Sequence, residues 1–267
     1  MSFDKKEAKL ASGTLPYFTA GSGTPLLYLH PAGGFSISKP LEALAARHQI
    51  FAPVTPGFDG TPVNPAVKSM EGLADLAASF IEAVIGTHCD VLGQSFGGWE
   101  ALWLAVKHSA KVDHLVLEAP AGVPAGGKGG LPADPAEARR KLFAYPDRAP
   151  PMTKPPEQLQ GNRRMLDHYG AISLSDPALP ARVAEIKAPT LILMGTKDEI
   201  IPRETGQYLK THIAGSHLAY VHDAAHGIES DQPERFLRIV ASFLERGDAY
   251  IVNWGESAAS AIPGGTR

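Results

Sequence analysis

Short apolar runs alternate along the chain with longer segments whose apolar residues recur at helical spacing. The spacing predicts helices over residues 41–47, 70–85, 96–108 and 233–245. The short runs predict strands at residues 26–29, 49–53, 89–93, 115–117, 191–194 and 218–222, and residues 8–20 predict an antiparallel edge. Strands separated by helices need crossover connections. The expected fold class is therefore α/β, a mostly parallel sheet covered by helices on both faces.

One long segment interrupts this alternation. Residues 122–187 contain many prolines and glycines, pieces of helical pattern and no convincing strand, and residues 126–130 predict a flexible loop. We interpret this segment as an inserted cap of short helices. The expected organisation is a core at 1–121 and 188–246, a cap at 122–187, and a poorly periodic tail at 247–267.

Composition narrows the expected partners. The chain has 267 residues, 44% hydrophobic and 20% charged, with a formal charge of −3 and no basic stripe, so we expect no nucleic-acid partner. The single cysteine, Cys89, excludes an intrachain disulfide and lies in an apolar run that predicts a buried structural thiol. No secretion signal or run of about 18 apolar residues occurs, so we expect a cytoplasmic protein without a membrane partner. The sequence leaves open whether the chain forms a homo-oligomer.

The candidate chemistry begins at the sequence Gly-Gln-Ser-Phe-Gly-Gly, residues 93–98, which lies between an apolar strand and a helical pattern. So tight a turn strains its central residue, Ser95, and glycines at 93 and 97 remove the collisions that side chains would cause. The hydroxyl is thereby exposed at a helix N-terminus, as a nucleophile requires. A helix-capping serine is the ordinary alternative. A phosphate-binding loop is disfavoured because the P-loop lysine is missing.

A serine hydroxyl needs a base, and the base needs a carboxylate. His226 follows the last predicted strand among small residues and is the candidate base, whereas His222 is expected to end that strand. Asp198, directly after the fifth strand, is the candidate acid. Glu199 and Glu118 remain as competing carboxylates.

Acyl transfer also needs two amides to meet the developing oxyanion. One candidate is the N–H of Phe96, and the other is the N–H of Ala32, with Gly33 as the next choice. Pro31 has no N–H and cannot donate. His30, beside this loop, is expected to be structural.

These pieces, together with Pro-Gly-Phe-Asp-Gly at 56–60, resemble the α/β-hydrolase family over residues 25–245. The resemblance implies Ser95 as nucleophile, Asp198 as acid, His226 as base, and Ala32 and Phe96 as oxyanion donors. Pro31 departs from the glycine that usually follows the oxyanion-loop histidine. A serine at position 95 argues against the dehalogenase and epoxide hydrolase branches, which use an aspartate there.

The expected function is hydrolysis of a carboxylic ester of a small or medium-sized molecule through an acyl-enzyme, with no metal or organic cofactor. A carbon–carbon hydrolase of ring-fission products, or a ligand receptor that keeps the triad, remains an alternative. The cap is expected to select the substrate. Its candidate side chains are Phe143, Tyr145, Met152, Met165 and Tyr169, with Arg139, Arg140, Arg163 and Arg164 as carboxylate binders or a solvated face.

Overall fold

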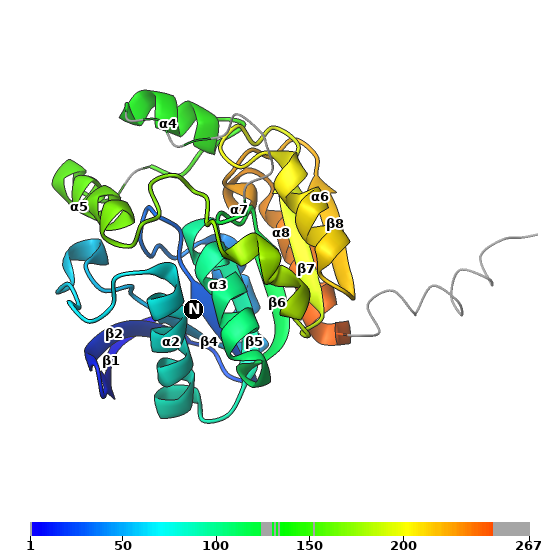
Figure 1. Ribbon diagram of the computed structural model, residues 1–267. Helices are drawn as coiled ribbons and strands as arrows, with labels where there is room; N and C mark the ends of the chain where they lie inside the picture. The colour runs from blue at the N-terminus through cyan, green and yellow to red at the C-terminus, as the bar shows by residue number, and fades with distance from the viewer. Residues whose placement is uncertain (1, 124–129, 131, 133, 152, 248–267) are drawn as a thin grey trace, which may run out of the picture.

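A twisted eight-stranded sheet forms the centre of the protein (Figure 1). The computed structural model describes residues 2–123, 130, 132, 134–151 and 153–247. The strand order is β1-β2-β4-β3-β5-β6-β7-β8; β2 pairs antiparallel with β1 and β4, and the other pairs are parallel. The strands are β1 (Asp4–Leu10), β2 (Gly13–Ala20), β3 (Thr24–Leu29), β4 (His48–Pro53), β5 (Cys89–Gln94), β6 (Val112–Glu118), β7 (Thr190–Gly195) and β8 (Ser216–Val221). This confirms the predicted α/β fold class, and the predicted antiparallel edge is a hairpin of two strands.

Helices cover both faces of the sheet. In Figure 1, α2, α3 and α6 lie in front of the sheet and α8 lies behind it. All four helices predicted from the sequence are present, and two further helices, α6 and α7, were not predicted. The helices outside the segment 122–187 are α1 (Lys39–Leu44), α2 (Met70–Phe80), α3 (Phe96–Lys107), α6 (Arg203–His212), α7 (Ile228–Asp231) and α8 (Pro233–Arg246).

The local sequence explains where these helices begin and end. Ser69 caps α2 by accepting a hydrogen bond from the Gly72 N–H, and a turn of π-helix, η2 (Ile81–Ile85), ends at Gly86 with φ of 113°. The apolar face of α2 packs against α3, whose residues from Phe96 to Val106 are all buried. This double burial fixes the start of α3 relative to the sheet.

The central strands are buried on both faces, as the uninterrupted apolar runs predicted. Every residue of β5 and β7 is buried, including Cys89, whose thiol pKa is raised to about 12 by burial. In the described part of the chain, no helix is long and apolar enough to cross a membrane.

Residues 122–187, called the helical insertion below, connect β6 to β7, and the helices at 135–142 and 156–168 within this segment lie beyond the carboxyl ends of the strands (Figure 1). The insertion contains α4 (Pro135–Leu142), α5 (Pro156–His168) and two short 3-10 helices, η4 (Leu179–Ala181) and η5 (Val183–Glu185). Apart from Gly130 and Gly247, the predicted flexible loop at 126–130 and the tail at 247–267 lie outside the described residues.

Candidate active site

Ser95 lies in a sharp turn between β5 and α3, with φ of 54° and ψ of −110°. Such a conformation is rare for a residue with a Cβ and persists only where the surroundings enforce it. Here the Ser95 N–H donates to the Glu118 carbonyl at 2.9 Å, and its carbonyl accepts from Trp99 and Ala121, each at 3.0 Å. A Cβ at Gly97 would collide with the Leu29 carbonyl, so the turn packs backbone to backbone on the end of β3.

His226 lies between Ser95 and Asp198. Its Nε2 is 2.8 Å from Ser95 Oγ, and its Nδ1 is 2.9 Å from Asp198 Oδ2. An ionised carboxylate only accepts hydrogen bonds, so Nδ1–H donates to Asp198 and Nε2 accepts from the serine hydroxyl. Ser95 is 6% exposed and His226 is 4% exposed. The order and geometry are those that nucleophilic catalysis requires.

Backbone contacts orient the Asp198 and His226 loops. Asp198 Oδ1 accepts the N–H groups of Ile200 at 2.8 Å and Ile201 at 3.0 Å, which leaves Oδ2 for the histidine. The Lys197 N–H donates to the Ala224 carbonyl at 2.8 Å, which joins the two loops. Each loop follows a parallel strand, so both emerge at the same edge of the sheet.

The alternative candidates for the acid and the base, Glu118 and His222, make other contacts or face solvent. Glu118 Oε1 accepts the Glu229 N–H at 3.0 Å and forms no hydrogen bond to His226 in the described part of the chain. The side chain of His222 is 77% exposed. His30 is buried, as expected of a structural residue.

Burial gives Glu118 a distinct electrostatic environment. Its Oε2 is buried without a hydrogen-bond partner among the described residues. Burial, followed by the negative charge of Glu229, raises the pKa of Glu118 well above its usual range, and burial raises the pKa of Glu229 to about 7. Glu118 therefore contacts the helix that follows His226, through the Glu229 N–H, and burial disfavours its charged form.

The loop after β3 forms a tight turn in which the Gly34 N–H donates to the Pro31 carbonyl at 2.9 Å. Ala32 and Gly33 are the central residues. Within the described part of the chain, neither the Ala32 amide nor the Phe96 amide donates to a backbone carbonyl in a turn or loop, so both remain candidates to meet an oxyanion.

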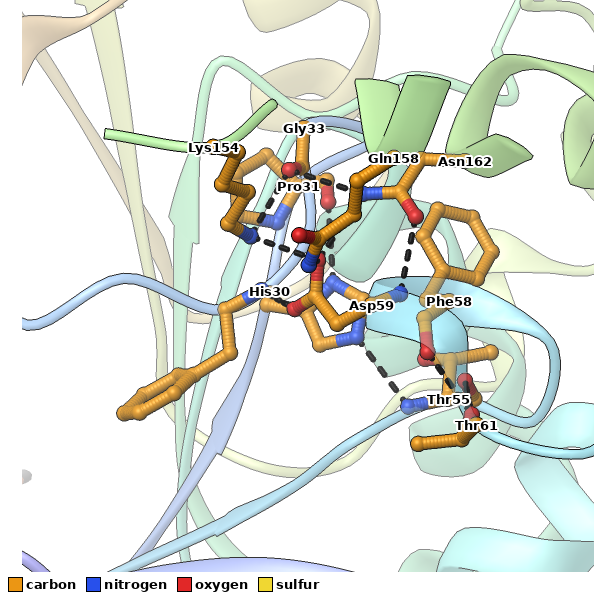
Figure 2. Close-up of polar contacts among 11 residues, drawn as sticks. His30, Pro31, Gly33, Thr55, Phe58, Asp59, Thr61, Lys154, Gln158 and Asn162 are labelled. Atoms are coloured by element: carbon orange, nitrogen blue, oxygen red, sulfur yellow. Dashed lines mark hydrogen bonds and ion pairs between the residues drawn. The ribbon is translucent and has the colours of Figure 1, made fainter. Parts of the chain in front are cut away.

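A polar cluster that the sequence did not reveal adjoins this turn. Figure 2 shows Lys154, Gln158 and Asn162 of the helical insertion converging on Asp59 and the Gly33 carbonyl. The Pro-Gly-Phe-Asp-Gly motif was a signal for Asp59, but no motif marks its partners.

The insertion residues proposed from sequence divide into two groups. Met165 and Tyr169 are buried, and the Tyr169 ring lies 6.2 Å from the Phe96 ring between centroids. Phe143 and Tyr145 are half-buried, and Met152 lies outside the described residues.

The four candidate arginines are not directed into the site as free cations. Arg140, Arg163 and Arg164 are exposed, and Arg163 donates to the Pro132 carbonyl at 2.6 Å. Arg139 donates to the carbonyls of residues 146, 149 and 150. The solvated-face alternative therefore describes most of this group.

Comparison with known proteins shows which protein family the chain matches. The model described as the alpha/beta hydrolase family matches residues 22–239. The 2-hydroxymuconate semialdehyde hydrolase of Pseudomonas sp. (strain CF600) is 29% identical over 262 residues, covering 88% of this chain and 91% of that protein. The pimeloyl-[acyl-carrier protein] methyl ester esterase of Neisseria meningitidis serogroup C is 31% identical over 200 residues, covering 64% of this chain and 75% of that protein.

Solved structures share the fold at lower identity. The 2-hydroxy-6-oxo-6-phenylhexa-2,4-dienoate hydrolase of Rhodococcus sp. strain RHA1 superposes with a TM-score of 0.76 at 19% identity, covering 91% of this chain and 100% of that one. An esterase from Exiguobacterium antarcticum superposes with a TM-score of 0.68 at 21% identity, covering 90% and 99%.

Proposed function

Because the chain belongs to the alpha/beta hydrolase family, we propose that it is a serine hydrolase that cleaves a carboxylic ester of a small or medium-sized molecule. The observation that carries the proposal is the contact of His226 with Ser95 at 2.8 Å and with Asp198 at 2.9 Å. The strained backbone of Ser95 supports the same role.

The reaction proceeds in two steps. Ser95 Oγ attacks the ester carbonyl carbon while its proton passes to His226 Nε2, and the amides of Ala32 and Phe96 stabilise the oxyanion. Collapse of this intermediate expels the alcohol, which takes the proton from His226, and leaves an acyl-serine. Water, deprotonated by His226, then releases the acid and restores the serine. Asp198 keeps the proton on Nδ1 and stabilises the imidazolium.

We further propose that residues 122–187 act as a cap that selects the substrate. The Gly227 N–H donates to the Leu142 carbonyl at 2.8 Å, and a Cβ at Gly227 would lie against the Phe143 ring. The insertion therefore contacts the residue next to the base. Phe143 and Tyr169 are the side chains best placed to limit acyl size.

Carbon–carbon bond hydrolysis is the second candidate, favoured by the 29% identity to 2-hydroxymuconate semialdehyde hydrolase over 88% of the chain. A ring-fission product of that kind carries a carboxylate, which needs a cation. Among the described residues of the insertion, Lys154 is a cation that reaches the turn after β3, where it donates to the Gly33 carbonyl, but its Nζ is paired with Asp59 at 2.7 Å. This pairing favours the neutral ester.

The test is a panel of p-nitrophenyl esters of increasing acyl length, run beside a 2-hydroxy-6-oxohexa-2,4-dienoate. We expect ester turnover with a kcat/KM at least about 10-fold above that for the dienoate. The reverse ratio would move the assignment to the carbon–carbon hydrolase. Binding of both substrates without turnover of either would instead indicate a receptor that retains the triad.

A further inference from the structure

The carbonyl of Gly33 receives two hydrogen bonds from the helical insertion, more than 120 residues away along the chain. Lys154 Nζ donates to it at 2.9 Å and Asn162 Nδ2 at 3.0 Å (Figure 2). Asn162 lies on α5 and is only 1% exposed. Burying a side-chain amide costs free energy unless its N–H and C=O groups are hydrogen-bonded. The hydrogen-bond partners of Asn162 therefore indicate its role.

Asp59 orients the Asn162 amide. The Asp59 N–H donates to Asn162 Oδ1 at 2.8 Å, and Asn162 Nδ2 donates to Asp59 Oδ1 at 3.0 Å. With its oxygen fixed by the backbone, the amide nitrogen must face the Gly33 carbonyl. Asp59 Oδ2 also accepts the Phe35 N–H at 2.8 Å, just after the turn. Burial opposes the charge of Asp59, but hydrogen bonds from Lys154 and Asn162 hold its pKa below the usual value.

The effect of Asn162 reaches the Ala32 amide through two planar peptide groups. The Gly33 carbonyl and the Gly34 N–H belong to one peptide plane, so fixing the carbonyl aims that N–H at the Pro31 carbonyl, 2.9 Å away. The Pro31 carbonyl and the Ala32 N–H belong to another plane. Holding Gly33 from the insertion therefore sets the direction of the candidate oxyanion donor.

The opposite side of the turn is fixed by the core. The Thr55 N–H donates to His30 Nε2 at 3.1 Å, so His30 carries its proton on Nδ1, which donates to the Pro31 carbonyl at 2.9 Å. Burial lowers the pKa of His30 to about 4, which keeps the ring neutral. The turn is therefore held on one side by hydrogen bonds from the helical insertion to Gly33 and on the other side by the hydrogen bond from His30 to Pro31.

We propose that Asn162 is a positioning residue for the oxyanion hole, so that the Ala32 amide is aimed at the transition state only while α5 is seated on the turn. This inference rests on the proposed function. It makes the helical insertion part of the catalytic apparatus as well as the wall of a substrate site.

The experiment compares Asn162→Ala with wild type, and uses Gln160→Ala, an exposed amide on the same helix, as the matched control. For p-nitrophenyl acetate, we expect Asn162→Ala to lower kcat by about 10- to 100-fold and to change KM by less than about threefold. A trifluoromethyl ketone, which adds to the serine as a tetrahedral oxyanion, should bind more weakly by a factor similar to the loss in kcat. Gln160→Ala should match wild type in all three values.

A second variant keeps the test decisive if Asn162→Ala fails to fold. Asn162→Leu has nearly the same size but can neither accept from the Asp59 N–H nor donate to the Gly33 carbonyl, and it adds no second carboxylate beside Asp59. Far-UV circular dichroism and Tm establish that each variant is folded. Wild-type kcat in the folded variants, or a reduced kcat with unchanged ketone affinity, would overturn the positioning role alone. A wild-type protein without ester turnover would instead contradict the proposed function on which the inference depends.

Discussion

Glu100 offers a quantitative test of the packing beneath the nucleophile. It lies on α3, the helix that begins at the Ser95 turn, and is 5% exposed. Its side chain lines a small cavity of about 10 Å³ with predominantly apolar neighbours, which are Leu15, Leu29, Pro53, Thr55, Pro56, Leu73, Leu76 and Ala77. Burial raises the pKa of Glu100 to about 8, so the folded protein holds it as a neutral acid near pH 7.

The sign of the stability effect follows from proton uptake. Between pH 4.5 and 8 the unfolded chain releases the Glu100 proton while the folded chain retains it, so the free energy of unfolding falls as pH rises. Glu100→Gln preserves the side-chain size and removes this titration. Relative to wild type, the unfolding free energy of the variant should rise by about 2–3 kcal/mol between pH 5 and pH 7, and by about 3–4 kcal/mol between pH 5 and pH 8.

The assay is urea unfolding of both proteins at half-unit steps from pH 5 to pH 8.5, with the difference in unfolding free energy plotted against pH. Glu234→Gln, an exposed carboxylate on α8, is the control, and its difference should stay within about 0.5 kcal/mol across the range. A difference for Glu100→Gln that does not rise with pH would refute the reasoning, because it would mean that Glu100 is solvated or paired in the folded state.

Three further substitutions test separate parts of the site. Gly97→Ala places a Cβ against the Leu29 carbonyl, so the free energy of unfolding in urea should fall by at least about 2 kcal/mol; unchanged stability would contradict the close packing of the turn on β3. Asp198→Asn removes the ionic acceptor of His226 Nδ1, so kcat for p-nitrophenyl acetate should fall by about 10³- to 10⁴-fold, and a loss below 10-fold would argue against Asp198 as the orienting acid. Glu118→Gln should keep kcat within about threefold. Because burial raises the pKa of Glu118 in the folded chain, the wild type should lose stability as the pH rises above the pKa of the unfolded chain, and the variant should become progressively more stable relative to it. A loss of kcat as large as that expected for Asp198→Asn would instead make Glu118 the acid.

The sequence predicted the parts of the fold and site that depend on local pattern and chain order. The sequence pointed to Ser95 as the candidate nucleophile because an apolar strand and a helical pattern flank its glycines. Asp198 and His226 were candidates because each follows a strand that parallel topology brings to the same edge, and the structure places His226 in contact with both Asp198 and Ser95. Glu118 also ends a strand at that edge, so the pattern alone left it open as a competitor, and the direction of its side chain became clear only from its contact with Glu229.

Features that depend on packing between distant segments were not predictable. The contacts of Asn162 and Lys154 with Gly33 join residues more than 120 positions apart, and no motif announces them. Helix α6 was missed for a different reason. It is mostly polar, and its buried face consists of Thr205, Gly206 and Leu209, which is too narrow an apolar stripe to predict a helix.

If Ser95 is the activated nucleophile of a hydrolase, a fluorophosphonate should modify it, and the position of the adduct can be mapped. The wild-type protein is incubated with the reagent, residual ester turnover is followed, and the modified peptide is located by mass spectrometry. We expect one adduct per chain, on Ser95, with turnover lost in proportion to labelling, and neither adduct nor turnover in Ser95→Ala. An adduct at another residue, or a Ser95→Ala variant that hydrolyses the ester at the wild-type rate, would contradict this role of Ser95.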